Sequence, residues 1–220
     1  MIEHKSSRMV HETLNRRRKG TSSPDQLSED VRKRIETIAL HVFSREDFHR
    51  ANIRLVASKA GVSLATIYKY YGDKEKLVFT LIDHFMKDLT DRLIDHLNGI
   101  ENLKEKMRKV FWVQLDYYER HPDLGQILFL TIPYKKWMFD KTYPQKKMFN
   151  ILLGVIRQGQ KEGILNADVR PGVLIDFMWG LIHRSFTMWT YRGQKESLTG
   201  NANILFEMLW RSISKPQEKG

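Results

Sequence analysis

The chain has 220 residues and a formal net charge of +11, from 37 lysines and arginines against 26 acidic residues. This length suits one large domain or a small domain joined to a larger one, and the charge favours nucleic acid or a membrane surface as a partner. Because cysteine is absent, disulfides, thiolate metal sites and cysteine nucleophiles are excluded. No apolar run reaches ~18 residues and the N-terminus lacks the apolar core of a signal peptide, which indicates a cytoplasmic protein.

The first 27 residues contain few apolar side chains and include the basic run RRRK at residues 16–19. We interpret residues 1–27 as a basic flexible arm. Beside a DNA-binding helix, such an arm can lie in the minor groove, where the potential is negative. The alternative is a solvated tail, and both interpretations stay open. From residue 28 to about residue 44, acidic residues come first and apolar residues follow at helical spacing, which predicts a helix.

Residues 53–74 carry two short helical patterns joined at a glycine. Asn52 is a suitable N-cap for the first pattern, and Gly61, which reaches positive φ without steric cost, stands where the chain must reverse. Ser63 caps the second pattern, whose outer face is short at the front and then aromatic and basic. This predicts a helix-turn-helix domain over residues 28–74, with groove contacts from Thr66, Tyr68 and Tyr70 and phosphate contacts from Ser63, Lys69 and Lys74. The full set of candidate DNA-binding residues is Asn52, Ser63, Leu64, Ala65, Thr66, Tyr68, Lys69, Tyr70 and Lys74.

This motif resembles the tetracycline-repressor (TetR) family of bacterial transcription regulators over about residues 30–80. Leu64 stands where many members have a polar or basic residue, Ala65 where glycine is usual, and Tyr71 where phenylalanine is usual. The first two lie on the expected base-reading face, so these departures concern the target sequence and not the fold. The residues that match the family pattern are Val56, Ala57, Ala60, Gly61, Val62, Ser63, Thr66, Ile67, Tyr68, Tyr71, Lys74, Glu75 and Leu77.

Beyond the motif, the pattern predicts an all-α protein: a three-helix DNA-binding unit and a larger helical domain for effector binding and dimerisation, residues 75–220. Asp73 caps a helix to about residue 98, which at ~1.5 Å per residue spans nearly 40 Å and must bridge the two parts. Within it, His84 is expected to be solvated. Further helices are expected at about 102–121, 127–130, 146–162, 171–191 and 204–213. The segment between Pro133 and Pro144 stays unassigned.

The last two predicted helices are apolar over more than one face. Such helices are buried on more than one side, and a symmetric partner would cover them. We therefore expect a homodimer joined by four helices, which reads an inverted-repeat operator with its recognition helices ~34–36 Å apart. Charged residues at Leu205 and Leu209 should separate the protomers. The predicted dimer interface comprises Trp179, Ile182, Phe186, Leu205, Met208 and Leu209.

Aromatic residues are abundant in the second half of the chain. They either fill one another's space or, as the family resemblance implies, line a cavity for an effector. The effector would be largely apolar or aromatic, with or without an anionic group, and His183 would serve as a structural hydrogen-bonding residue or as a ligand contact. The candidate pocket residues are Trp112, Leu115, Tyr118, Phe149, Leu153, Phe177 and Met178.

Two functions from different classes follow. The first is a DNA-binding regulator, a repressor released from its operator by a small effector of unknown identity. The second is a helical scaffold that uses the three-helix unit without binding DNA. An enzyme is the least favoured class, because the sequence has no HExxH, GxSxG or glycine-rich phosphate loop. No cofactor and no metal site are expected.

Overall fold

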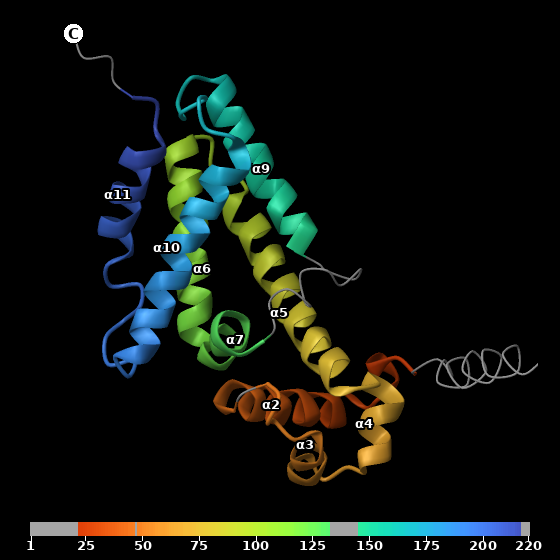
Figure 1. Ribbon diagram of the computed structural model, residues 1–220. Coiled ribbons are helices and arrows are strands. Elements are labelled where there is room, and N and C mark those ends of the chain that lie inside the picture. The colour runs from red at the N-terminus through yellow and green to blue at the C-terminus, as the bar shows by residue number, and fades with distance from the viewer. Residues whose placement is uncertain (1–21, 47, 133–144, 217–220) are drawn as a thin grey trace, which may run out of the picture.

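The computed structural model describes residues 22–46, 48–132 and 145–216, and in these ranges the protein is helical (Figure 1). Among the described residues, the only strand-like pairing is an isolated bridge between Leu165 and Ser214. The predicted all-α fold is confirmed. The basic run at residues 16–19 and the segment between Pro133 and Pro144 lie outside the described residues.

Three helices form the N-terminal unit: α2 (Glu29–Arg45), α3 (Ile53–Ala60) and α4 (Leu64–Tyr71). The side chain of Asn52 accepts a hydrogen bond from the Arg54 amide at 2.9 Å, and Ser63 accepts one from the Thr66 amide at 3.0 Å. Between them Gly61 takes a φ of 62°, a left-handed conformation that few side chains tolerate. These local signals produce the predicted helix-turn-helix. Its core is formed by Ile35, Ala39, Phe43, Val56, Ala57 and Ile67.

Helix α5 (Lys74–Leu97) joins this unit to the rest of the chain (Figure 1). Asp73 caps it by accepting a hydrogen bond from the Lys76 amide at 2.8 Å. Its 24 residues span ~36 Å, and its buried stripe packs on α2 and α4 and further along on α6 and α9. The helix ends one residue before the predicted position.

The larger part of the molecule contains α6 (Leu103–Arg120), α9 (Gln145–Lys161), α10 (Pro171–Tyr191) and α11 (Ala202–Ile213). Helix α10 packs on α6 and α9, and α11 packs on the other side of α6 (Figure 1). Two short elements, α7 (Pro122–Gln126) and the π-helix η2 (Ile127–Thr131), contact α2 and so join the two parts a second time. The sequence predicts a helix only over the second, since the preceding one is expected to stop at about residue 121; Pro122 instead takes the first position of α7, which proline fits.

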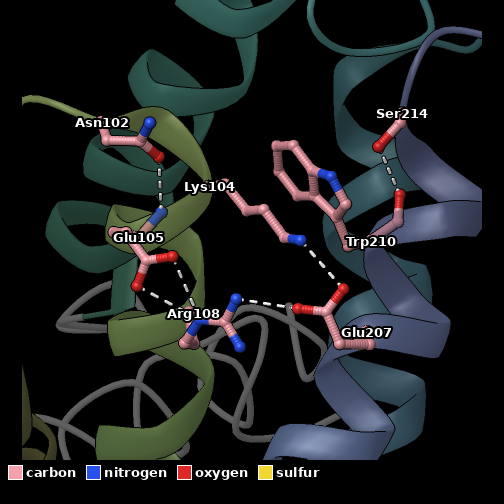
Figure 2. Close-up of polar contacts among 7 residues, drawn as sticks. All are labelled: Asn102, Lys104, Glu105, Arg108, Glu207, Trp210 and Ser214. Carbon is pink, nitrogen blue, oxygen red and sulfur yellow. Dashed lines mark hydrogen bonds and ion pairs between the residues drawn. The ribbon is translucent and has the colours of Figure 1, made fainter.

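An ionic cluster holds α11 against α6 (Figure 2). The carboxylate of Glu207 accepts hydrogen bonds from Lys104 at 2.9 Å and Arg108 at 2.8 Å, and Arg108 also contacts Glu105. These hydrogen bonds lower the pKa of Glu207. The Arg108 guanidinium lies 4.9 Å from the centre of the Phe206 ring, in cation–π geometry. The cluster fixes which side of α11 faces outward.

Within the described ranges, every helix is either too short or too polar to cross a membrane.

Candidate nucleic-acid interface and ligand cavity

The accessible face of α4 consists of residues three and four positions apart. Ala65, Tyr68 and Lys69 are exposed, with 48% of the Tyr68 surface accessible. Ile67 and Tyr71 are buried on the opposite side. Because residues at i, i+3 and i+4 share one face of a helix, α4 presents a short, an aromatic and a basic side chain together.

The other candidate residues of α4 are less accessible. Leu64, Thr66 and Tyr70 are half-buried. The hydroxyls of Thr66 and Ser63 lie 2.8 Å apart, and the ammonium of Lys69 lies 4.8 Å from the centre of the Tyr70 ring. Ser63 and Thr66 are thus engaged in starting the helix, and Tyr70 supports Lys69 from the side.

Two candidate residues outside α4 have structural partners. Asn52 caps α3 through its side-chain oxygen. The ammonium of Lys74 donates to the carbonyl oxygens of Phe48, His49 and Ala51 at 2.6, 3.2 and 3.2 Å. An ammonium has three hydrogens, so these carbonyls account for all of them. The geometry gives Lys74 a structural role in place of the predicted phosphate contact.

The N-terminal end of the described chain lies against the last turn of α4. The Ser22 amide donates to the Lys69 carbonyl at 3.0 Å, and a short 3₁₀ helix, η1 (Pro24–Gln26), follows. Leu27 packs against the core. Residues 22–27 therefore belong to the helix-turn-helix unit and not to the predicted arm, because their backbone and side chains have partners in it.

A shared carboxylate joins three helices on the inner side of the unit. Glu36 of α2 accepts a hydrogen bond from the Tyr71 hydroxyl of α4 at 3.3 Å, and its same oxygen lies 3.3 Å from Nδ1 of His84 on α5. The hydrogen bond with Glu36 raises the pKa of His84. The expectation of a solvated His84 was therefore wrong, since its ring is partly covered and has a charged partner.

Helix α7 connects the same α2 to the larger part. The Asp123 carboxylate accepts a hydrogen bond from the Ser44 hydroxyl at 2.9 Å and lies 3.6 Å from Nδ1 of His41. Two residues later, Gly125 lies directly beneath the ring of Phe186, where a Cβ atom would come within 2.4 Å of a ring carbon. One face of α7 thus contacts the helix-turn-helix unit while another is fitted closely to α10.

A cavity of about 410 Å³ lies between α6, η2, α9 and α10. The indole Nε1 of Trp179 donates to Oε1 of Gln114 at 3.2 Å, and the rings of Phe129 and His183 stack with centres 4.8 Å apart. The wall is mostly apolar and aromatic. Its lining residues are Gln114, Tyr118, Leu128, Phe129, Leu130, Ile132, Met148, Asp176, Trp179, Gly180, Ile182 and His183.

The predicted pocket overlaps this cavity only in part. Tyr118 lines the cavity, and Phe149 contacts its Trp179 wall with ring centres 6.0 Å apart. Phe177 is 51% exposed on the outside of α10, because helical periodicity places it away from Trp179. The four other predicted pocket residues also do not line the cavity: Leu115 and Met178 are buried in the core, whereas Trp112 and Leu153 are half-buried.

The predicted dimer interface also needs correction. Ile182, Phe186 and Leu209 are at most 1% exposed within the single chain, so no surface of theirs remains for a partner. Trp179 lines the cavity and Leu205 is half-buried, whereas Met208 is 60% exposed. The exposed apolar residues of α10 and α11, which we call the outer face, are Val173, Phe177, Tyr191, Ile204 and Met208.

A second hollow, of about 480 Å³, opens where α10 ends and α11 begins. Arg184, Arg192 and Lys195 line it together with Trp189. None of these three cations forms an ion pair with another residue in the described part of the chain. The two hollows therefore differ in charge: among the described residues, this one is lined by three cations and one carboxylate, Glu196, whereas the first is lined by one carboxylate and neither lysine nor arginine.

Comparison with known proteins finds one matching family model, bacterial regulatory proteins of the tetR family, over residues 37–81. The match spans the end of α2, the helix-turn-helix and the start of α5.

Similarity to individual proteins extends beyond that region. The fatty acid metabolism regulator protein of Bacillus subtilis is 23% identical over 177 residues, which cover 80% of this chain and 91% of the relative. The transcriptional repressor NicS of Pseudomonas putida is 25% identical over 148 residues, 66% of this chain and 70% of the relative. The crystal structure of FadR from Bacillus subtilis in complex with stearoyl-CoA superposes with a TM-score of 0.72 at 22% identity, covering 80% and 96% of the two chains.

Proposed function

Because the chain belongs to the TetR family of bacterial regulatory proteins, we propose that it is a transcriptional repressor that binds an inverted-repeat operator as a homodimer and leaves it when a small, largely apolar molecule fills the cavity. The observation that carries this proposal is the accessible face of α4, where Ala65, Tyr68 and Lys69 stand together on a capped helix-turn-helix. Such a regulator works where bacterial DNA is found, in the cytoplasm, and needs neither catalysis nor a cofactor.

The DNA contacts are assigned by accessibility. Tyr68 and Ala65 would face the bases of the major groove, and Lys69 would contact a phosphate, with Ser63 at the helix N-terminus next to the backbone of the duplex. Lys74 is left out, because its ammonium is held by three carbonyl oxygens. The net charge of +11 supports attraction to a polyanion.

The outer face supports a dimer. Five large apolar side chains of α10 and α11 are between 42% and 83% exposed, and a second copy would bury them in a four-helix contact. In the view of Figure 1, α10 and α11 lie to the left of α5, and the three-helix unit lies below them. A two-fold axis at the outer face would present two copies of α4 to the same side of a duplex.

The cavity supports control by an effector. It has the size of a small-molecule site, and its η2 wall continues into α7, which contacts α2 through Asp123. To change the protein from mostly DNA-competent to mostly incompetent, a ligand needs a ~10⁴-fold preference, about 5.5 kcal/mol, which burial of an apolar molecule can supply. The similar B. subtilis FadR was crystallised with stearoyl-CoA, which shows that a relative of this fold binds an apolar chain.

The test is operator binding by purified protein and two variants. The operator is first selected from a random DNA pool, and an inverted repeat is expected. Tyr68→Ala should lose about 1–3 kcal/mol of operator affinity, because a base-contacting side chain is removed. Lys69→Gln should weaken binding to all sequences and reduce the slope of log affinity against log salt by about 1. Lys161→Gln, at an exposed lysine in the last turn of α9, is the matched control.

The competing function is a helical scaffold that does not bind DNA. The two functions differ in salt dependence: operator binding should weaken steeply between ~50 and 200 mM salt, because phosphate contacts release counterions, whereas docking of apolar helices should hardly respond. If no sequence is enriched and both variants behave like the parent, the scaffold is the better explanation.

A further inference from the structure

We infer that the cavity between α6, η2, α9 and α10 takes an organic cation, with an apolar or aromatic body inside the cavity and its positive charge against Asp176. This inference rests on the proposed function, because it names the chemical class of the effector for the same cavity. Among the described residues that line the cavity, Asp176 is the only acidic one, and neither lysine nor arginine is present. The local charge is thus opposite to the net charge of the chain.

The carboxylate of Asp176 has no fixed partner. No hydrogen bond or ion pair joins it to another residue of the described chain. Asp176 is exposed at the cavity wall, so a ligand that fills the cavity displaces part of the water around this carboxylate, which is unfavourable unless the ligand brings a positive charge or hydrogen-bond donors. An anionic ligand would add repulsion between like charges to that cost. The position therefore selects against carboxylates and phosphates and favours protonated amines or quaternary ammonium groups.

The aromatic groups near Asp176 favour the same ligand. Trp179 and Gly180 lie three and four residues after Asp176, on the same face of α10. The indole is oriented by its hydrogen bond to Oε1 of Gln114, and the amide nitrogen of this glutamine in turn donates to the Val110 carbonyl. A cation beside Asp176 would lie in a cavity that Trp179 and Phe129 also line, and aromatic rings attract positive charge.

Gly180 leaves the space in which the ligand body would lie. A Cβ atom built at Gly180 has no heavy atom within 4 Å, and the same is true of Gly154 on α9, which does not line the cavity. Neither glycine has the positive φ that would strain another residue. Gly180→Leu can therefore fill the cavity, and Gly154→Leu makes the same change outside it.

The experiment compares three probes with one bicyclic body: 2-(2-naphthyl)ethylamine, 2-(2-naphthyl)ethanol and 2-naphthylacetate. Their affinities for the full-length protein are measured by isothermal titration calorimetry. The amine should bind about tenfold more tightly than the carboxylate, from the sum of an ion pair and a cation–π contact at a partly exposed site. Asp176→Asn should reduce this preference to within about twofold and leave the alcohol unchanged. Asp168→Asn, which removes an exposed carboxylate outside the cavity, should leave the preference intact.

The location is tested with the two leucine variants. Gly180→Leu should weaken the amine and the alcohol, whereas Gly154→Leu should not. Arg192→Gln should weaken only the carboxylate if that probe binds the basic hollow. The inference is overturned if the carboxylate binds as tightly as the amine in the α6–α10 cavity, if the preference survives Asp176→Asn, or if none of the probes binds at millimolar concentration.

Operator binding is measured in parallel, so that failure of the repressor function can be distinguished from failure of the cavity assignment. If the amine binds with the expected preference but the protein binds no operator, the repressor function is wrong and the cavity assignment stands. If the protein binds its operator and the preference for the amine is absent, the cavity assignment is wrong and the repressor function stands.

Discussion

The ammonium group of Lys74 closes the loop that leads from α2 into α3. It donates to the carbonyl groups of Phe48, His49 and Ala51 in that loop and lies 4.8 Å from the centre of the Phe48 ring. Since Lys74 is also the first residue of α5, it ties the start of the long helix to the entrance of the helix-turn-helix. Because the ammonium group of Lys74 binds carbonyl groups of the protein itself, its removal should lower the stability of the fold.

Lys74→Met should lower the free energy of unfolding by about 1–3 kcal/mol, because charged hydrogen bonds to three carbonyl groups of the loop are lost while the aliphatic stem is kept. Urea denaturation measures this, and Lys76→Met, at an exposed lysine of the same turn, should change stability by less than about 0.5 kcal/mol. If Lys74→Met were as stable as the parent but weak in operator binding, the phosphate contact predicted from the sequence would be restored.

His84 gives a second prediction, on pH. Its hydrogen bond with Glu36 raises its pKa above the usual 6.5. A group whose pKa rises on folding stabilises the folded state fully below the unfolded pKa, and this contribution is lost as pH rises through the folded pKa. The difference in unfolding free energy between the parent and His84→Gln should therefore be larger at about pH 5.5 than at about pH 8.

The prediction concerns the difference between the parent and His84→Gln because the pKa of His121 is shifted in the opposite direction. Burial lowers the pKa of His121, so its contribution favours the folded state at higher pH and is lost as pH falls. Both proteins keep His121, and its effect cancels in the difference. His96→Gln, at an exposed position near the end of α5, makes the same substitution away from Glu36 and serves as the control.

For single helices, the sequence predicts the ends correctly where the residues that determine them are close together along the chain. Asn52, Gly61, Ser63 and Asp73 each end or begin a helix through contacts with residues at most a few positions away, and all four positions are as predicted. Helix α10 is different. It is apolar around most of its circumference, so periodicity cannot tell which face meets the core, the cavity or a second chain.

The errors in the candidate site follow from that ambiguity. The sequence predicts Phe177 in the pocket and Trp179 in the dimer interface, whereas Trp179 lines the cavity and Phe177 is exposed. Both side chains are aromatic, and only the neighbouring helices determine which of them faces the cavity. One sequence signal was overlooked: Asp176 and His183 lie seven residues apart, and so on one side of an otherwise apolar helix, which marks a face that is not core. On α4, the exposure of Ala65, Tyr68 and Lys69 follows directly from the helical period, and their contact with DNA stays a prediction.

Helix α7 gives a prediction at this scale. Gly125→Ala would place a methyl group within 2.4 Å of a Phe186 ring carbon, so the ring or α7 must move. This should cost about 1–3 kcal/mol, as overpacking does in closely packed cores. Phe186→Leu removes the ring with which this methyl group would clash. The loss of unfolding free energy in the double variant should therefore be smaller than the sum of the two single losses by about 0.5–3 kcal/mol.

Urea denaturation of the four proteins measures this coupling. Simple additivity would mean that α7 is free to shift away from α10, and the contact could not then relay changes at the cavity to α2. Gly154→Ala is the control for the helix propensity of alanine, because its Cβ meets nothing within 4 Å.

At the scale of the whole molecule, the ionic cluster on α11 determines what a second chain would meet. Glu207 points toward α6 and is held by Lys104 and Arg108 (Figure 2), whereas Ile204 and Met208 of the adjacent turns of α11 are exposed. These are one helical turn apart. Val173 and Phe177 of α10 are exposed as well, and a second chain that packs two of its helices on α10 and α11 would bury all four side chains.

Ile204→Glu combined with Met208→Glu should therefore give monomers. Burial of each side chain contributes ~1.5–3 kcal/mol, and a two-fold interface contains each of them twice, so about 6–12 kcal/mol of association energy is lost before any cost of burying carboxylates. Sedimentation velocity at micromolar concentration should show one species of half the parental mass, with an unchanged helical circular dichroism spectrum. Operator affinity should fall to that of a single half-site. Asn150→Glu combined with Gly154→Glu, on the exposed side of α9, adds the same charge and should remain dimeric. If the α11 variant stays dimeric and the α9 variant separates, the two chains meet through α9, and the spacing of the two α4 helices must be derived anew from that contact.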